Sequence, residues 1–204
     1  DAARERCEAM VRHARAQIMA VGVDRFSLNE VLRLSGGSKA TLAKYFGDRN
    51  GLIAAAIGAE ARNAMAALDL EGEASRAEPL AGALARALSG ILQFYLSPGS
   101  LALYRAVISA APASAGGAEA FYHHGHRLIV DALAGLLERR QPGQVRAGLD
   151  CRDIADQLLH AIRAGLYEQA LVGLAPAADL TAIDRRIAAT LALVLPGIAA
   201  SGNT

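Results

Sequence analysis

The side chains with the clearest chemical potential lie in a short segment, residues 38–45, that reads Ser-Lys-Ala-Thr-Leu-Ala-Lys-Tyr. Hydroxyl and ammonium groups in the first turn of a helix can bind phosphates and the edges of base pairs. A helix that exposes such groups can read the major groove of DNA. The candidate contact residues are therefore Ser38, Lys39, Ala40 and Thr41, with Ala43, Lys44 and Tyr45 further along the helix.

A preceding helix and a sharp turn are needed to position this segment. Ser27-Leu-Asn-Glu30 forms a capping box, in which the Ser27 hydroxyl accepts from the Glu30 amide and the Glu30 carboxylate reaches back. The helix that begins there is broken by Ser35-Gly36-Gly37, because glycine adopts a left-handed conformation at little cost. Ser38 then caps the next helix, which runs to Phe46.

Apolar side chains predict how these two helices pack. Val31, Leu32 and Leu42 point inward and lock the helices together, with Phe46 as a further core residue. Two short helices joined by a three-residue turn that contains glycine are typical of a helix-turn-helix. Residues 27–46 are therefore predicted to form one.

The rest of the chain also predicts helices. Apolar residues recur every three or four positions over residues 3–20, and Asp48 can cap a helix that runs to about residue 70. Further helices are expected from residue 80 to 97, 101 to 111, 121 to 140, and 150 or 153 to 171, and Asp179 begins a last one that contains Ile183, Ile187, Leu191 and Val194. No strand-like alternation is visible, so the fold class is all-α with about nine helices.

Composition and charge narrow the function classes without choosing one. Hydrophobic residues make up 53% of the 204 residues, which is enough for a sizeable core. Residues 1–51 carry nine basic and six acidic side chains, whereas the remainder carries twelve and fourteen. A mildly basic head on a mildly acidic body permits a polyanion-binding end, although ordinary solvated helix faces explain the excess equally well.

The sequence gives little support for a metal site or a catalytic site. His123 and His126 share a helix face, so two metal ligands are geometrically possible, but an exposed, histidine-rich helix start is the plainer interpretation. The chain has no HExxH motif, no glycine-rich phosphate loop and no nucleophile paired with a base. We predict no enzyme activity, no metal and no cofactor.

The segment from Phe26 to Leu52 resembles the N-terminal domain of TetR-type repressors. The residues that match the family pattern are Ser27, Gly36, Ser38, Thr41, Leu42, Tyr45, Phe46, Asp48 and Leu52. The chain departs from it at Gly37, where the family has valine, at Ala43, where it has tyrosine, and at Arg49 and Asn50, where it has lysine and glutamate. The loss at Gly37 is expected to remove a small core contact.

The resemblance implies roles for the head residues. Ser27 and Ser38 would contact phosphates, Lys39 and Thr41 would contact base edges, and Ala40 would touch a thymine methyl group. The DNA backbone would be held by Lys44, Tyr45 and Arg49. A DNA-binding domain over residues 1–48 and a ligand-binding and dimerisation domain over residues 49–204 follow from the same resemblance.

The resemblance also implies a ligand pocket in the body. Aromatic side chains with a polar group suit an apolar or amphipathic ligand that needs one or two hydrogen bonds. The candidates are Phe94, Tyr95, Tyr104, Ile108, Phe121, Tyr122, His126, His160 and Tyr167. Each of them could instead simply fill the core.

The last two predicted helices are expected to pair with a second copy of the chain, as the resemblance implies. The expected interface residues are Leu158, Ala161, Ile162, Gly165, Leu166, Ile183, Ile187 and Leu191. Small residues let helices approach closely, and a palindromic DNA site needs two heads. Packing within one chain is the alternative explanation for these apolar faces.

The sequence therefore predicts a homodimeric regulator that binds double-stranded operator DNA and responds to a small molecule, most simply a repressor. The alternative is an all-α carrier or enzyme whose head no longer binds DNA. Two distant cysteines, no visible signal peptide and no long apolar run predict a cytoplasmic protein that does not enter a membrane.

Overall fold

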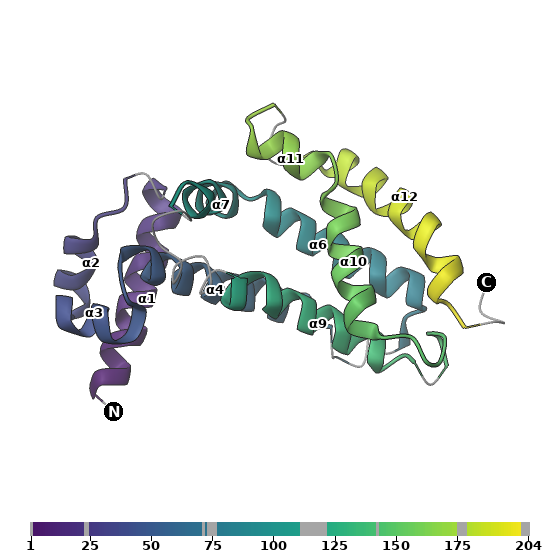
Figure 1. The fold of residues 1–204 in the computed structure, drawn as a ribbon, viewed down its shortest axis with the longest axis horizontal. Coiled ribbons are helices and arrows are strands. Elements are labelled where there is room, and N and C mark those ends of the chain that lie inside the picture. Colours follow the sequence, from purple (N-terminus) through teal and green to yellow (C-terminus); the bar gives the residue numbers. More distant parts are fainter. Residues whose placement is uncertain are drawn as a thin grey trace. The chain divides into compact units, whose positions relative to one another are not determined.

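The computed structural model describes residues 2–22, 25–70, 72, 77–110, 122–141, 143–174 and 179–200. In these ranges the chain forms ten α-helices and one π-helix, with no β-strand and a single isolated bridge between Val145 and Ala199 (Figure 1). The predicted all-α class is confirmed.

The helices belong to two compact units. The first contains Asp1–Arg62 and Pro98–Arg127, and the second contains Asn63–Ser97 and Leu128–Thr204. Helix α4 (Arg49–Ala67) runs through both units. The predicted boundary after residue 48, between a DNA-binding and a ligand-binding domain, is a boundary of function. The two compact units are divided by packing and do not test it, so the boundary stays a prediction.

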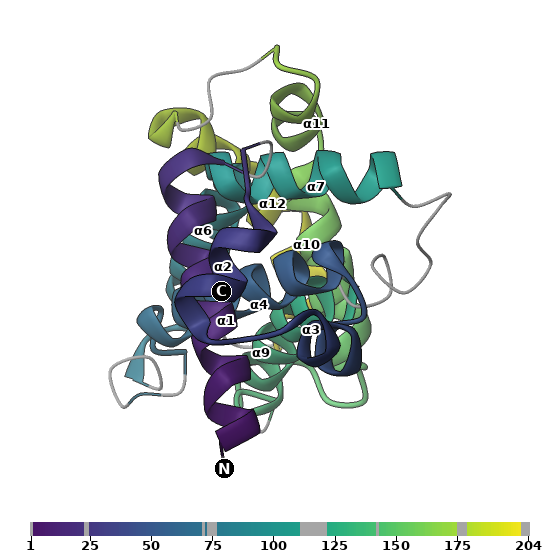
Figure 2. The ribbon, with the colours of Figure 1, turned by 90° about the vertical axis from the view of Figure 1, so that its left-hand side faces the viewer.

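Helices α1 (Ala2–Val21), α2 (Leu28–Ser35) and α3 (Lys39–Phe46) form the head of the first unit (Figure 2). Helix α1 packs against both α2 and α3. Its buried face consists of Met10, Ala14 and Ile18, three side chains at the helical spacing that the sequence indicated. The same unit contains α7 (Pro98–Ala110) and the π-helix η1 (Tyr122–His126).

The second unit is built around α6 (Leu80–Leu96), whose apolar face is buried along its whole length. Helices α10 (Cys151–Arg163), α11 (Leu166–Leu171) and α12 (Leu180–Ile198) all pack against α6. Helix α9 (Arg127–Glu138) adds a second fully buried apolar face, with Ile129, Leu133, Leu136 and Leu137 at its centre.

Most helix starts agree with the sequence because they are set by local capping groups. The Asp150 side chain accepts from the amides of Arg152 and Asp153, and Asp179 accepts from the Ala182 amide. Asp48 accepts from the Gly51 amide at 2.8 Å and so caps α4 as predicted.

Two helix boundaries were predicted wrongly. The expected long helix over residues 150–171 is two helices, because Gly165 has a φ of +83° and breaks the chain between α10 and α11. Pro98 begins α7 directly after α6, since a proline fits the first position of a helix. The last helix, α12, begins after Asp179 as predicted and continues through Pro196 to Ile198.

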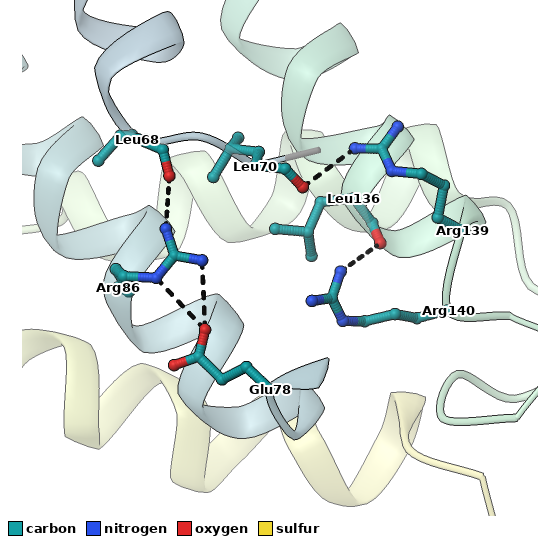
Figure 3. A network of polar contacts seen from close by, with 7 residues as sticks. All are labelled: Leu68, Leu70, Glu78, Arg86, Leu136, Arg139 and Arg140. Atoms are coloured by element: carbon teal, nitrogen blue, oxygen red, sulfur yellow. Dashed lines mark hydrogen bonds and ion pairs between the residues drawn. The ribbon is translucent and has the colours of Figure 1, made fainter. Parts of the chain in front are cut away.

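Within the second unit, arginine side chains donate hydrogen bonds to the backbone of the turn that follows α4 (Figure 3). Arg86 donates to the Glu78 carboxylate at 3.2 and 3.3 Å and also to the Leu68 carbonyl oxygen. Arg139 donates to the Leu70 carbonyl oxygen at 3.4 Å. The turn's amides donate within the chain, Leu68 to the Ala64 and Met65 carbonyls and Asp69 to the Ala66 carbonyl, and the guanidinium groups satisfy the Leu68 and Leu70 carbonyl oxygens.

Candidate nucleic-acid interface

The first turn of α3 presents polar and small side chains to solvent. Ser38, Lys39 and Ala40 are exposed, and Thr41 is half-buried. Leu42 is buried on the opposite side of the helix, against the other head helices. The sequence also predicted Phe46 as a core residue, but its side chain is only half-buried. The exposed stripe of α3 is the arrangement that reading a DNA groove requires.

Hydrogen bonds fix the start of α3. The Ser38 hydroxyl accepts from the Thr41 amide at 3.1 Å, which confirms Ser38 as the N-cap. The hydroxyl oxygens of Ser38 and Thr41 lie 3.0 Å apart and share a further hydrogen bond. Both hydroxyls are therefore oriented before any ligand arrives.

The predicted capping box at α2 is half correct. The Ser27 hydroxyl accepts from the Glu30 amide at 3.4 Å, as expected. The Glu30 carboxylate does not reach back, because it pairs with Arg33 at 3.2 Å. The Ser27 amide instead donates to Gln17 Oε1 of α1 at 2.6 Å. Gln17 thus ties α1 to the start of α2, a role that the sequence analysis missed because the contact is ten residues away.

The turn between α2 and α3 explains the unusual glycine at position 37. Gly36 has a φ of +64° and ends α2, so it is the glycine that the turn requires. A β-carbon at Gly37 would lie 2.8 Å from the Met10 sulfur and 3.0 Å from Ser35 Oγ. Met10 is fully buried and fills the space that a larger side chain would take. The Met10 side chain thus fills the space in the core that the missing side chain at Gly37 was expected to leave.

Basic and aromatic groups surround the exposed stripe. Lys44 and Tyr45 are exposed, and the Lys44 ammonium lies 5.1 Å from the centre of the Tyr45 ring. The Arg49 guanidinium carbon lies 5.2 Å from the centre of the Phe26 ring, which holds this side chain at the start of α4. The roles of these three residues and of Ser27 on the DNA backbone stay predictions.

The predicted ligand-binding residues fall in both units. In the second unit the rings of Tyr95 and Tyr167 are buried 5.6 Å apart, and Phe94 lies 6.0 Å from Tyr95. His160 is exposed on α10, where its Nδ1 lies 2.8 Å from the Asp156 carbonyl oxygen.

The remaining ligand-binding candidates belong to the first unit. Tyr122 and His126 have ring centres 5.3 Å apart on η1, while on α7 Tyr104 is half-buried and Ile108 is exposed. Phe121 lies outside the described residues. The ligand-binding role of all these side chains stays a prediction.

The predicted dimer residues need a correction. Five of the eight are buried within the single chain, where they form the core between α6, α10 and α12; they are Leu158, Ile162, Ile183, Ile187 and Leu191. Side chains that already pack inside one chain offer no surface to another. Ala161, Gly165 and Leu166 are exposed or half-buried.

A cavity of about 510 Å³ opens in the second unit, where the start of α6 meets the end of α12. None of the predicted ligand-binding residues lines it; the lining residues are Ala77, Pro79, Leu80, Ala81, Gln144, Leu195, Pro196 and Ala199. Its volume lies within the range of small-molecule pockets.

The described ranges contain no group of three or more histidine, cysteine or acidic side chains placed to share a metal ion. Cys7 is half-buried, Cys151 is buried, and both are free thiols. No single helix in the described part of the chain is long and apolar enough to cross a membrane, although α6 and the start of α7 reach that length together.

An all-α chain whose head presents an exposed recognition helix belongs to the helix-turn-helix class. Residues 82–196, more than half of the chain, match the family model described as "AefR-like transcriptional repressor, C-terminal domain", a TetR-type domain. The chain therefore belongs to the TetR family of transcriptional regulators.

Solved structures of similar fold agree with this membership. A protein of Mesorhizobium loti assigned to the TetR family is 18% identical, with a TM-score of 0.76 over 97% of this chain and 98% of that one. The flavonoid-responsive regulator FrrA is 23% identical, with a TM-score of 0.69 and the same coverage. A TetR regulator of Agrobacterium tumefaciens is 25% identical, with a TM-score of 0.59 over 96% and 95% of the two chains. A comparison with curated proteins found no match.

Proposed function

We propose that this TetR-family regulator is a repressor that binds operator DNA through α3 as a homodimer and is released by a small apolar or amphipathic molecule. The observation that carries the proposal is the exposed first turn of α3, where the side chains of Lys39 and Ala40 make no hydrogen bond, ion pair or ring contact with the described part of the chain. Their side chains can meet base edges without breaking any interaction that holds the head together.

Release by a ligand follows from two states with different head separations. Recognition helices about 34–36 Å apart fit two successive major grooves. A small molecule that binds better to another separation shifts the population away from the DNA-binding state, and operator DNA weakens its binding by the same factor. FrrA, a flavonoid-responsive regulator, has the same fold, which supports a small aromatic molecule as the effector.

A homodimer is supported by the outer face of α12. This face exposes Ala188, Ala189 and Ala192 beside Leu193, whose side chain is 83% exposed. Ala192 lies four positions after Ala188 and three after Ala189, and Leu193 lies four after Ala189, so the residues share one side of the helix. Small side chains let a second helix approach closely, and an isolated leucine in water gains by being covered. The proposed interface thus uses the opposite face of the helix from Ile183 and Ile187.

Selection of DNA from a random pool, followed by binding measurements at several salt concentrations, tests the proposal. We expect an enriched palindrome and a linear fall of log affinity with log salt, at a slope of about −0.9 for each phosphate contacted. Lys44→Ala should weaken binding to all sequences alike and reduce the slope by about two, because each copy of the homodimer loses one phosphate contact. Arg62→Ala, which removes the same charge from an exposed position of α4 outside the head helices and the proposed interface, is the matched control and should change neither.

A slope near zero and no enriched sequence would contradict the proposal and favour a small-molecule-binding protein that no longer reads DNA. A normal slope with no palindrome would contradict the homodimeric mode of binding while leaving DNA binding in place.

A further inference from the structure

The cavity between the start of α6 and the end of α12 has apolar, uncharged walls. Its lining residues are alanine, leucine and proline, with Gln144 as the exception. The charged groups nearest in sequence are engaged elsewhere, since Glu78 pairs with Arg86 (Figure 3) and Arg146 donates to the Pro196 carbonyl oxygen at 3.2 Å. An ion would lose its hydration in this cavity without meeting a counter-charge. The walls therefore suit a neutral, mostly apolar molecule.

The side-chain amide of Gln144 is the polar group of this cavity. Its Oε1 atom is buried and accepts no hydrogen bond, and its Nε2 atom donates none, to any described residue. Gln141 in the same turn behaves differently, because its Nε2 donates to the Leu149 carbonyl oxygen at 2.9 Å. A buried amide oxygen without a donor costs free energy, and native structures rarely leave one so.

Backbone hydrogen bonds hold Gln144 beside the end of α12. Its amide donates to the Arg140 carbonyl oxygen at 2.8 Å, and its carbonyl oxygen accepts from the Ala200 amide at 3.0 Å. The next residue, Val145, forms the isolated bridge with Ala199. The backbone therefore cannot easily withdraw the side chain from the cavity. The terminal torsion of a glutamine is broad, so the unpaired amide turns toward a ligand at little cost.

We propose that this cavity binds a neutral, mostly apolar molecule through a hydroxyl group that hydrogen-bonds the Gln144 amide. A hydroxyl donates and accepts, so it satisfies either end of the amide. The apolar part of the molecule displaces water that apolar walls hold poorly. The site is separate from the aromatic side chains predicted to bind the effector, since none of them lines it. The inference goes beyond the proposed function, because it needs neither DNA nor a second copy of the chain.

Two probes of the same size test the role of the hydroxyl in equilibrium dialysis at pH 7. The first is 2-naphthol, and the second is 2-methylnaphthalene, in which a methyl group replaces the hydroxyl. Gln144→Met keeps the length of the side chain but removes its amide. It should weaken 2-naphthol binding about three- to tenfold and change 2-methylnaphthalene binding less than about twofold. Gln93→Met, the same change at an exposed position of α6 outside the cavity, should alter neither affinity.

A second pair of variants tests the location. Ala81→Trp places a large side chain in the cavity from an exposed position of α6, and it should weaken binding of both probes at least about tenfold. Ala66→Trp, at an exposed position of α4 that does not line the cavity, should leave both affinities unchanged. On the unmodified protein, 2-naphthoate should bind at least about tenfold more weakly than 2-naphthol, because the walls offer no cation.

Four results would overturn the inference. They are a dissociation constant of 2-naphthol above about 1 mM, an unchanged 2-naphthol affinity in Gln144→Met, unchanged binding of both probes in Ala81→Trp, and equal binding of 2-naphthoate and 2-naphthol. An equal loss of both probes in Gln144→Met would also contradict it, because Gln144 would then only support the walls of the cavity.

Nuclear magnetic resonance of the unmodified protein keeps the test open if Gln144→Met does not fold. Addition of 2-naphthol should shift the side-chain amide signals of Gln144 and the backbone amide signals of Leu80 and Ala199. Shifts confined to the surroundings of Tyr95 and Tyr167 would place the probe elsewhere and contradict the inference. None of these titrations contains DNA, so their outcome is independent of the salt-dependent DNA binding that tests the proposed function.

Discussion

At the scale of the residue, the first turn of α3 separates side chains by how firmly they are held. The hydroxyls of Ser38 and Thr41 bind each other and the backbone, whereas Lys39 extends into solvent. A held hydroxyl loses little conformational freedom when it meets a base, so it suits a specific contact. A long, mobile ammonium group suits a contact whose exact geometry varies between sites.

Thr41→Ala should relax the sequence preference at one base pair. The change removes one hydroxyl but leaves the Ser38 hydroxyl bonded to the backbone amide at position 41, so α3 should keep its start. Discrimination at that base pair should fall by about 1–3 kcal/mol, measured by repeating the DNA selection with the variant. Thr41→Ser retains the hydroxyl and should restore the preference. A uniform loss over all sequences would instead make Thr41 a contact to the DNA backbone.

Cys151 should react slowly with alkylating reagents. Burial raises the pKa of the Cys151 thiol, and the negative charges of Glu138 and Asp150 raise it further. The reactive thiolate is therefore scarce as well as shielded. Iodoacetamide labelling at pH 8, followed by mass spectrometry, should modify Cys7 at least about tenfold faster than Cys151. Equal rates would mean that the start of α10 opens readily.

The same pKa shift predicts a loss of stability at alkaline pH. Because the folded state holds the thiol proton more tightly, its contribution to the free energy of unfolding is full below the ordinary thiol pKa and is lost as pH rises through the raised value. Urea titrations of the unmodified protein between pH 7.5 and 10 should show this decline. Cys151→Ala should remove that part of it, whereas Cys7→Ala should not.

At the scale of the element, the turn from α3 into α4 depends on a glycine. A β-carbon at Gly51 would lie 1.8 Å from the Phe46 carbonyl oxygen, a backbone atom that cannot move aside without shifting the end of α3. Gly51→Ala should therefore lower the free energy of unfolding by at least about 1–3 kcal/mol, measured by urea titration. Gly99→Ala is the matched control, since nothing lies within 4 Å of its added carbon. Equal stability of the two variants would contradict this account.

The head helices were predictable because their boundaries are set by neighbours in the chain. Ser27, Ser38 and Asp48 cap helices within three residues of themselves, and Gly36 supplies the positive φ that ends α2. Such signals are visible in the sequence. The exposed stripe of α3 followed from the same pattern, since Leu42 fixes which side faces inward.

The break between α10 and α11, the packing of the predicted dimer residues and the burial of Arg163 could not be predicted from the sequence, because they depend on more than local signals. The apolar spacing of α10 continues across Gly165, so periodicity alone joined two helices that a left-handed glycine separates. Apolar faces also do not reveal what covers them, which is why Leu158 and Ile187 were assigned to a dimer although they pack within the chain. Arg163 gave no signal at all, because burial of an arginine depends on helices distant in sequence.

At the scale of the whole molecule, the proposed repressor would work as a pair. Two heads on one palindrome combine their affinities only if the two copies are joined, so the proposed interface on α12 would control DNA binding as well as assembly. Leu193→Arg places a charge on the exposed face without disturbing the core. It should give monomers in light scattering that still unfold in one cooperative transition, and weaken binding to the selected palindrome far more than binding to a half-site.

Leu158→Arg shows how a variant behaves when it destabilises the fold, and so distinguishes loss of the dimer from unfolding. Leu158 is 1% exposed, so an arginine there would bury an unpaired charge in the core and lower the melting temperature sharply, whatever the state of assembly. Leu34→Arg, on the exposed surface of α2, controls for the added charge and should stay dimeric in light scattering without DNA. An intact dimer in Leu193→Arg would move the interface away from the outer face of α12. A monomeric unmodified protein at micromolar concentration would contradict paired binding altogether.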